Sequence, residues 1–85
     1  MGRFDVSEIQ KFVCGRVSAI TGSVDVLITD DFFSAGGDSF DAIVLSAEIV
    51  QRYGVTIHVA DVLDAESFAD LSNRIADALV AAGNG

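Results

Sequence analysis

The chain has no proline, no tryptophan and a single cysteine, Cys14, among its 85 residues. One cysteine excludes an intrachain disulfide and a metal site built from several cysteines. Basic residues are also few, because five Lys and Arg stand against 13 Asp and Glu and give a formal net charge of −8. This charge would repel a nucleic-acid backbone and attract a basic partner surface.

Long apolar runs, linkers and repeats are missing as well. No run approaches the length that crosses a bilayer, and no basic segment followed by an apolar one opens the chain. We therefore expect a cytoplasmic protein that binds neither membranes nor nucleic acid. An apolar fraction of 51% argues against disorder. The sequence predicts one domain over residues 1–85, with an ordered core of about 5–80 and little room for an enclosed active site.

Apolar residues at helical spacing predict an all-α protein with three main helices. We expect these helices at about 6–20, 39–53 and 68–80, with a long connection at 21–38. Residues 54–66 contain alternating apolar positions, so periodicity alone would predict a short strand there. Such a strand would have no partner in a helical protein.

The helix ends carry local signals. Asp5 with Glu8, and Ser67 with Asp70, have the spacing of capping boxes. Gly22 is expected to end the first helix. Cys14 is interpreted as a small packing residue. Arg16, near the edge of the apolar stripe, is expected to extend along the surface with its charge in water.

The long connection should be either functional or held by its own side chains. Phe32 or Phe33 is expected to enter the core before the chain turns at Gly36 and Gly37, which permit positive φ and close backbone approach. Further apolar anchors are expected at Val24, Val26, Leu27 and Ile28.

Ser39 opens the central helix and is expected to be its N-cap, while Asp38 and Asp41 favour the helix start through the macrodipole. One apolar stripe should be core: Ala42, Ile43, Leu45, Ile49 and Tyr53. A second stripe lies roughly opposite, with acids and Gln51 beside it: Phe40, Val44 and Ala47. The second stripe fits recognition by partner proteins, or alternatively packs on the preceding loop.

Catalytic chemistry finds little support. The elbow pattern G-x-S-x-G around Ser39 fails because position 41 is Asp, and the single histidine, His58, receives no role. No catalytic residue and no dedicated metal site are therefore expected. The acids of the connection lack calcium-loop spacing and allow at most a weak, incidental cation site: Asp25, Asp30, Asp31 and Asp38.

The run DDFFSAGGDSF, from Asp30 to Phe40, resembles the attachment motif of acyl and peptidyl carrier proteins, written D-x-F-F-x-L-G-G-[HD]-S-[LI]. The similarity extends from about Val6 to Leu79. It implies a small four-helix bundle whose fourth, short helix lies near 60–64. It also implies that Ser39 carries 4'-phosphopantetheine, whose thiol holds the substrate as a thioester.

The spacing D-x-F-F-x-x-G-G-D-S looks more like peptidyl carriers of nonribosomal peptide synthesis than fatty-acid carriers. Val44 and Val50 stand where fatty-acid carriers usually have glutamates. Two residues depart from the motif. Ala35 replaces leucine, which makes that core contact smaller, and Phe40 replaces leucine or isoleucine, which alters the surface beside Ser39.

Because Met1 lies close to the first helix with no flanking domain, the chain resembles a freestanding carrier, although an excised domain would look the same. We expect a monomer that serves secondary-metabolite biosynthesis, including antibiotic and polyketide pathways. Its partners would be a phosphopantetheinyl transferase, an adenylating or acyl-transferring loading enzyme, and downstream condensing or tailoring enzymes. Partner recognition is assigned to Asp38, Phe40, Asp41, Val44, Ala47 and Glu48. The alternative is an acidic helical interaction module that is never modified, in which Ser39 only caps a helix.

Overall fold

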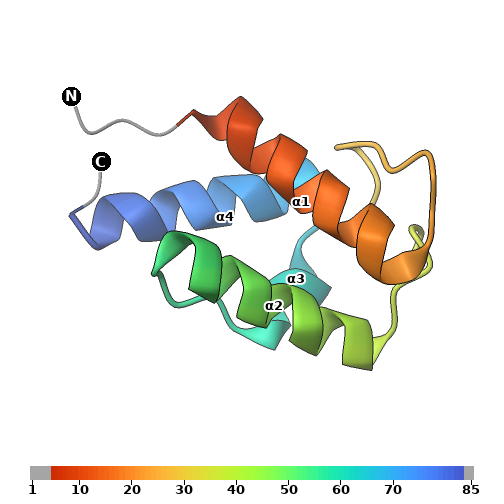
Figure 1. The fold of residues 1–85 in the computed structure, drawn as a ribbon. Helices are drawn as coiled ribbons and strands as arrows, with labels where there is room; N and C mark the ends of the chain where they lie inside the picture. The colour runs from red at the N-terminus through yellow and green to blue at the C-terminus, as the bar shows by residue number, and fades with distance from the viewer. Residues whose placement is uncertain (1–4, 84–85) are drawn as a thin grey trace.

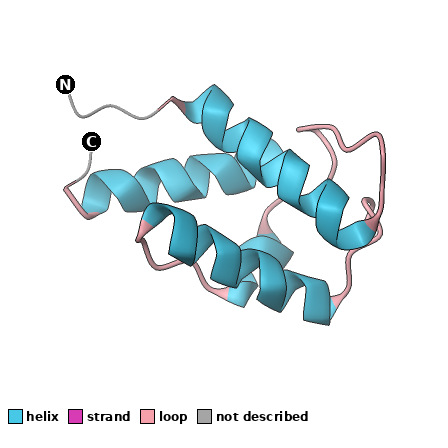
Figure 2. Ribbon diagram, in the orientation of Figure 1, coloured by secondary structure: helices cyan, strands magenta, loops and turns pink. Residues whose placement is uncertain are grey.

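The computed structural model describes residues 5–83, which form four helices and no strand. The helices are α1 (Val6–Thr21), α2 (Ser39–Tyr53), α3 (Val59–Asp64) and α4 (Phe68–Ala81). Helix α1 packs on α4 and α2, and the short α3 packs on α2 and α4 (Figures 1 and 2). The all-α bundle of three main helices and one short helix is confirmed. None of the described helices combines the length and apolarity needed to span a bilayer.

The core collects one face from every helix. Its largest fully buried apolar side chains are Ile9, Val13, Val17, Phe32, Leu45, Ile49, Val62, Phe68, Leu71 and Ile75. Those from α1, α2 and α4 recur at helical spacing, because each of these helices buries a single stripe against its neighbours. Burial of that stripe fixes the rotation of α2 about its axis and therefore the direction in which its first residue points.

The helix ends largely follow the local signals. Asp5 caps α1, but its carboxylate accepts from the Ser7 N–H at 3.0 Å, so the expected box with Glu8 is replaced by a shorter Asx-type contact. At α4 the Ser67 hydroxyl accepts from the Asp70 N–H at 3.0 Å, as predicted. The return bond differs, because the Asp70 carboxylate accepts from Glu66 N–H at 3.1 Å.

The connection between α1 and α2 begins at Gly22, whose φ of 80° ends α1 in the left-handed region as predicted. Three of its four predicted apolar anchors were wrong. Val24, Leu27 and Ile28 are 88%, 59% and 41% exposed, and only Val26 packs partly against the core.

Hydrogen bonds hold this connection instead. The first N–H groups of α4 point at the loop, and Phe68 N–H donates to the Asp30 carbonyl at 2.8 Å. Ala69 N–H donates to the Ile28 carbonyl at 2.8 Å. These helix N–H groups have no partner within their own helix, so the loop satisfies them while it gains its own anchorage. Exposed apolar side chains are therefore compatible with an ordered loop.

Residues 54–58 are extended but pair with no strand. Val55 and Ile57 are buried, which explains the alternating pattern without a sheet. His58 is exposed and immediately precedes α3, where its backbone N–H donates to the Asp61 carboxylate at 2.9 Å. The extended loop followed by a short helix is confirmed.

Candidate functional site

The turn before α2 is built around one aromatic ring. Phe32 is 2% exposed, whereas Phe33 is 57% exposed, so Phe32 is the residue that enters the core. Gly36 has a φ of 89°, in the left-handed region. Gly37 lies directly on the Phe32 ring, because a Cβ added there would lie 2.4 Å from a ring carbon. The two glycines therefore serve different purposes, one for backbone conformation and the other for close approach.

Ser39 is not the N-cap of α2, so this prediction was wrong. Asp38 is the cap, and its Oδ1 accepts from the Asp41 N–H at 2.9 Å. The Asp41 carboxylate in turn accepts from the Asp38 N–H at 3.4 Å, which completes a capping box. A carboxylate caps a helix as well as a hydroxyl does, and here it stands one residue earlier. Ser39 thus becomes the first helical residue.

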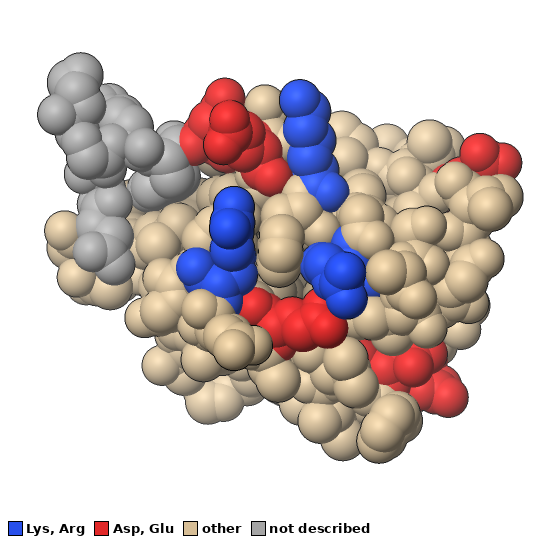
Figure 3. All heavy atoms as spheres, viewed as in Figure 1, with Lys and Arg blue, Asp and Glu red and all other residues tan. Residues whose placement is uncertain are grey.

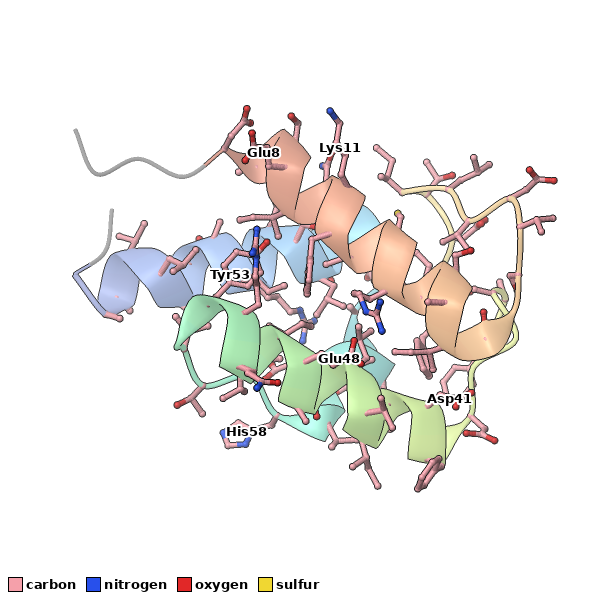
Figure 4. The ribbon with its side chains drawn as sticks, in the orientation of Figure 1. Glu8, Lys11, Asp41, Glu48, Tyr53 and His58 are labelled. Carbon is pink, nitrogen blue, oxygen red and sulfur yellow. The ribbon has the colours of Figure 1, made fainter. Side chains whose placement is uncertain are left out.

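Consequently the Ser39 hydroxyl is left free. Ser39 is exposed, and its hydroxyl makes no hydrogen bond within residues 5–83. It stands at the helix end where backbone N–H groups and the macrodipole favour an added negative group. No histidine adjoins it in sequence, the neighbouring Asp38 and Asp41 carboxylates are engaged in the capping box, and in Figure 4 the labelled His58 lies away from Asp41 along α2. The arrangement leaves an accessible hydroxyl at the start of α2.

The outer face of α2 differs from the predicted stripe. Phe40 is 70% exposed and Ala47 is exposed, as partner recognition requires, but Val44 is half-buried. Ile43, which was expected in the core, is 52% exposed because no other described element covers that side of α2. With Val50, 41% exposed, these residues continue the exposed face. We call the exposed set Phe40, Ile43, Ala47 and Val50 the outer strip.

Glu48, assigned to partner recognition, contacts α1. Arg16 reaches it with two hydrogen bonds, Nε to Oε1 at 2.7 Å and Nη2 to Oε2 at 3.2 Å (Figure 4 shows Glu48 on α2). The hydrogen bond and charge of Glu48 raise the pKa of the Arg16 guanidinium. Arg16 therefore forms an ion pair rather than only extending along the surface as predicted. Two residues 32 positions apart meet here, which local sequence patterns do not reveal.

Acidic residues of the connection order the loop itself. The Asp30 carboxylate accepts from Leu27 N–H at 2.9 Å, and the Asp31 carboxylate accepts from Ser34 N–H at 3.1 Å. Hydrogen bonds from the Ser34 side chain and backbone lower the pKa of Asp31. Among residues 5–83, no three His, Cys, Asp or Glu side chains gather to hold a metal ion.

Cys14 packs partly against the core and lines a pocket together with Val26, Leu27 and Ile28 of the loop. Burial, with a smaller contribution from Asp30, raises the pKa of its thiol. A thiol with a raised pKa stays protonated at neutral pH and is a poor nucleophile. The interpretation of Cys14 as a packing residue agrees with this placement.

Comparison with known proteins identifies the family. The profile of the family described as "Phosphopantetheine attachment site" matches residues 11–75. Bassianolide nonribosomal cyclodepsipeptide synthetase of Beauveria bassiana is 40% identical over 72 residues, which are 85% of this chain and 2% of that protein. Enniatin synthetase of Fusarium oxysporum is 38% identical over 69 residues, 81% of this chain and 2% of the synthetase. The chain thus spans about 2% of the length of these relatives.

Solved structures agree in fold. The nonribosomal peptide synthetase FmoA3 with bound AMPPNP superposes with a TM-score of 0.76 and 28% identity, over 89% of this chain and 8% of that one. A docking-domain complex of the Pax nonribosomal peptide synthetase gives a TM-score of 0.78 at 23% identity, over 86% of this chain and 71% of that one. The second likeness shows the fold alone. Together with the profile match, these findings show that the chain belongs to the phosphopantetheine attachment site family, as a carrier domain of the nonribosomal peptide synthetase type.

Proposed function

We propose that Ser39 is the residue that receives 4'-phosphopantetheine and that the chain acts as a non-catalytic carrier, modified by a phosphopantetheinyl transferase. The observation that supports this choice is the free, exposed Ser39 hydroxyl at the start of α2. Within the matched residues 11–75, Ser34 is the other exposed serine, and it is engaged with Asp31. Ser39 is therefore the serine best placed for transfer.

The residues around Ser39 fit the group. A phosphodiester on Ser39 would lie beside the N-terminal N–H groups of α2, where the helix dipole favours negative charge. Capping by Asp38 leaves the Ser39 oxygen free for a covalent bond without loss of the helix start. When attached, the group supplies a thiol that holds the substrate as a thioester. The chain itself positions the attachment point and offers surface to partner enzymes.

We further propose that partners recognise the start and outer strip of α2. An adenylating or acyl-transferring enzyme would load the carrier, and condensing or tailoring enzymes would receive the substrate. Asp38 and Asp41 with the exposed Phe40 surround Ser39, and Val44 and Ala47 follow along the helix. An exposed apolar strip beside carboxylates suits a partner with an apolar patch and basic residues around it. Of the assigned residues, Glu48 is the least available because Arg16 holds it.

Residues 1–85 are proposed to work as one carrier unit, with about 5–80 as the ordered core. That the carrier is freestanding, cytoplasmic and monomeric stays a prediction, since the matched relatives are much longer proteins. The nature of the carried substrate would be chosen by the loading enzyme.

Intact-protein mass spectrometry tests the attachment site. The protein is incubated with coenzyme A and a broad-specificity phosphopantetheinyl transferase, beside Ser39→Ala and Ser34→Ala variants whose folding is checked by circular dichroism. The parent and Ser34→Ala should gain the mass of one phosphopantetheine, and Ser39→Ala should gain none. A gain in folded Ser39→Ala would place the attachment elsewhere. No gain in the folded parent would favour the unmodified interaction module.

A further inference from the structure

A second surface lies between α1 and the C-terminal half of α2. It is a hollow of about 360 Å³. Its lining residues, which we call the basic groove, are Phe12, Arg16, Glu48, Gln51 and Arg52. Arg52 follows Ser39 by 13 positions in the same helix, which places the two about 20 Å apart along the axis. The basic groove is therefore distinct from the attachment site and from the outer strip.

The groove gathers positive charge on a strongly acidic chain. Residues 5–83 contain four basic residues, and two of them, Arg16 and Arg52, line the groove beside one acid, Glu48. Figure 3 shows Lys and Arg side chains on this face of the molecule, with acidic side chains between and beside them. On a chain of net charge −8, such a grouping is the region that complements an acidic partner.

Arg52 is held in place and remains available. Its guanidinium carbon lies 5.5 Å from the ring centroid of Phe12 and 5.9 Å from that of Tyr53. The two rings meet edge to face at 5.5 Å, which makes a rigid aromatic platform for the cation. Among residues 5–83, Arg16 and Arg74 have carboxylate partners within 4.0 Å, whereas Arg52 has none.

We propose that the basic groove docks an acidic peptide segment of a partner protein. A carboxylate of the segment pairs with Arg52, and an aliphatic side chain of the segment enters the hollow against Phe12. The Arg16–Glu48 pair lines one side of the hollow. Because Glu48 already pairs with Arg16, Arg16 needs no carboxylate from the bound segment. Because the aromatic rings already orient Arg52, little conformational freedom is lost on binding.

Docking at this face would serve a carrier by holding the domain near a partner while Ser39, at the other end of α2, stays free. A segment bound here raises the effective concentration of the carrier at the partner without covering the attachment point. The proposal does not depend on Ser39 being modified. It can therefore fail while the attachment proposal stands, and the reverse is also possible.

The test uses ¹⁵N-labelled protein and an acetylated, amidated pentapeptide, Asp-Glu-Leu-Glu-Asp, with the neutral peptide Asn-Gln-Leu-Gln-Asn as control. The acidic peptide should shift amide signals of Phe12, Arg16, Gln51 and Arg52 at about 0.15 M salt, where a Debye length of about 8 Å screens most of the chain's net negative charge. The variant Arg52→Gln should weaken binding at least about threefold. The matched variant Arg74→Gln, whose arginine is paired with Asp61 and Asp70, should leave binding unchanged.

Three results would overturn the proposal. The first is the absence of shifts at the groove up to about 5 mM peptide, where a site with a dissociation constant of about 1 mM would be mostly filled. The second is equal binding of the neutral peptide. The third is undiminished binding by Arg52→Gln with a native-like spectrum. Ser39→Ala, run in parallel, should bind the acidic peptide as the parent does.

Discussion

The two faces of α2 are similarly apolar in sequence and opposite in environment. On the inner face Ala42, Leu45 and Ile49 are fully buried, whereas Phe40 and Ile43 on the outer face are 70% and 52% exposed. Helical spacing separates the faces, but only the packing of α1 and α3 decides which one is covered. The comparison teaches that apolar residues of one helix can be buried in the core or left exposed, and the exposed ones are those that we propose partners recognise.

The largest expected effect comes from truncating the inner face. Leu45→Ala should lower the free energy of unfolding by about 3 kcal/mol, because it removes buried contacts and leaves a cavity. Ile43→Ala on the outer face should change it by less than about 0.5 kcal/mol. Urea denaturation of both variants measures the difference. Similar losses for the two would show that the outer face is covered in solution.

A second contrast is between Gly37, which lies on the buried Phe32 ring before α2, and Gly15, which has open space around it. Gly37→Ala should lower the free energy of unfolding by about 1–3 kcal/mol, because the added Cβ would collide with the buried Phe32 ring. Gly15→Ala is the matched control, since no atom outside its own helix backbone and chain neighbours lies within 4 Å of the added Cβ. There the substitution should stabilise α1 by up to about 1 kcal/mol through helix propensity. Thermal unfolding of both variants measures the difference. An unchanged unfolding midpoint for Gly37→Ala would contradict this account.

Capping distinguishes two exposed neighbours at the same helix start. Asp38→Ala should cost about 1 kcal/mol, because it removes the side-chain acceptor for Asp41 N–H. Ser39→Ala should lower the free energy of unfolding by only about a few tenths of a kcal/mol, since Ser39 is a helical residue with a free hydroxyl. Chemical denaturation of the unmodified proteins tests the order. The reverse order would restore Ser39 as the cap.

The smallest expected effect concerns the Asp31 carboxylate, which accepts hydrogen bonds from Ser34 in the loop between α1 and α2. Hydrogen bonds from Ser34 lower the pKa of Asp31, so ionised Asp31 favours the folded loop. This contribution is complete above the ordinary Asp pKa of about 3.9 and is lost as pH falls through the lowered folded value. Ser34→Ala should move the Asp31 pKa back up. Carboxyl NMR titration measures the Asp31 pKa, and an unchanged titration in the variant would show that the Ser34 hydroxyl is not the cause.

Local patterns predicted most of the fold. The bounds of the three main helices were predicted to within one residue, because hydrophobic period, caps and the left-handed Gly22 act over a few positions. The short α3 was implied by the family resemblance, since the local pattern there favoured a strand. The attachment motif likewise located the turn and the exposed Ser39. The cap of α2 was mispredicted although it is local, because two adjacent residues, Asp38 and Ser39, were both competent acceptors.

Other features could not be predicted from local patterns. The choice of Phe32 over Phe33 for the core depends on the packing that the ring meets beneath Gly37. The contact of Arg52 with Phe12 joins residues of two helices. Exposed apolar residues in the loop were expected to be anchors, because the sequence does not show that α4 supplies hydrogen bonds to the loop backbone.

The sequence by itself determined where helices begin and end, the acidic charge and the motif that contains Ser39, because these depend on neighbours along the chain. The sequence also predicted the buried stripe of Ala42, Leu45 and Ile49, but tertiary structure alone decided that Ile43 lies outside it and that Glu48 pairs with Arg16. It also placed Arg52 on an aromatic platform. The physical reason is that burial and ion pairing depend on which elements pack together, and α1 and α2 meet across a long loop.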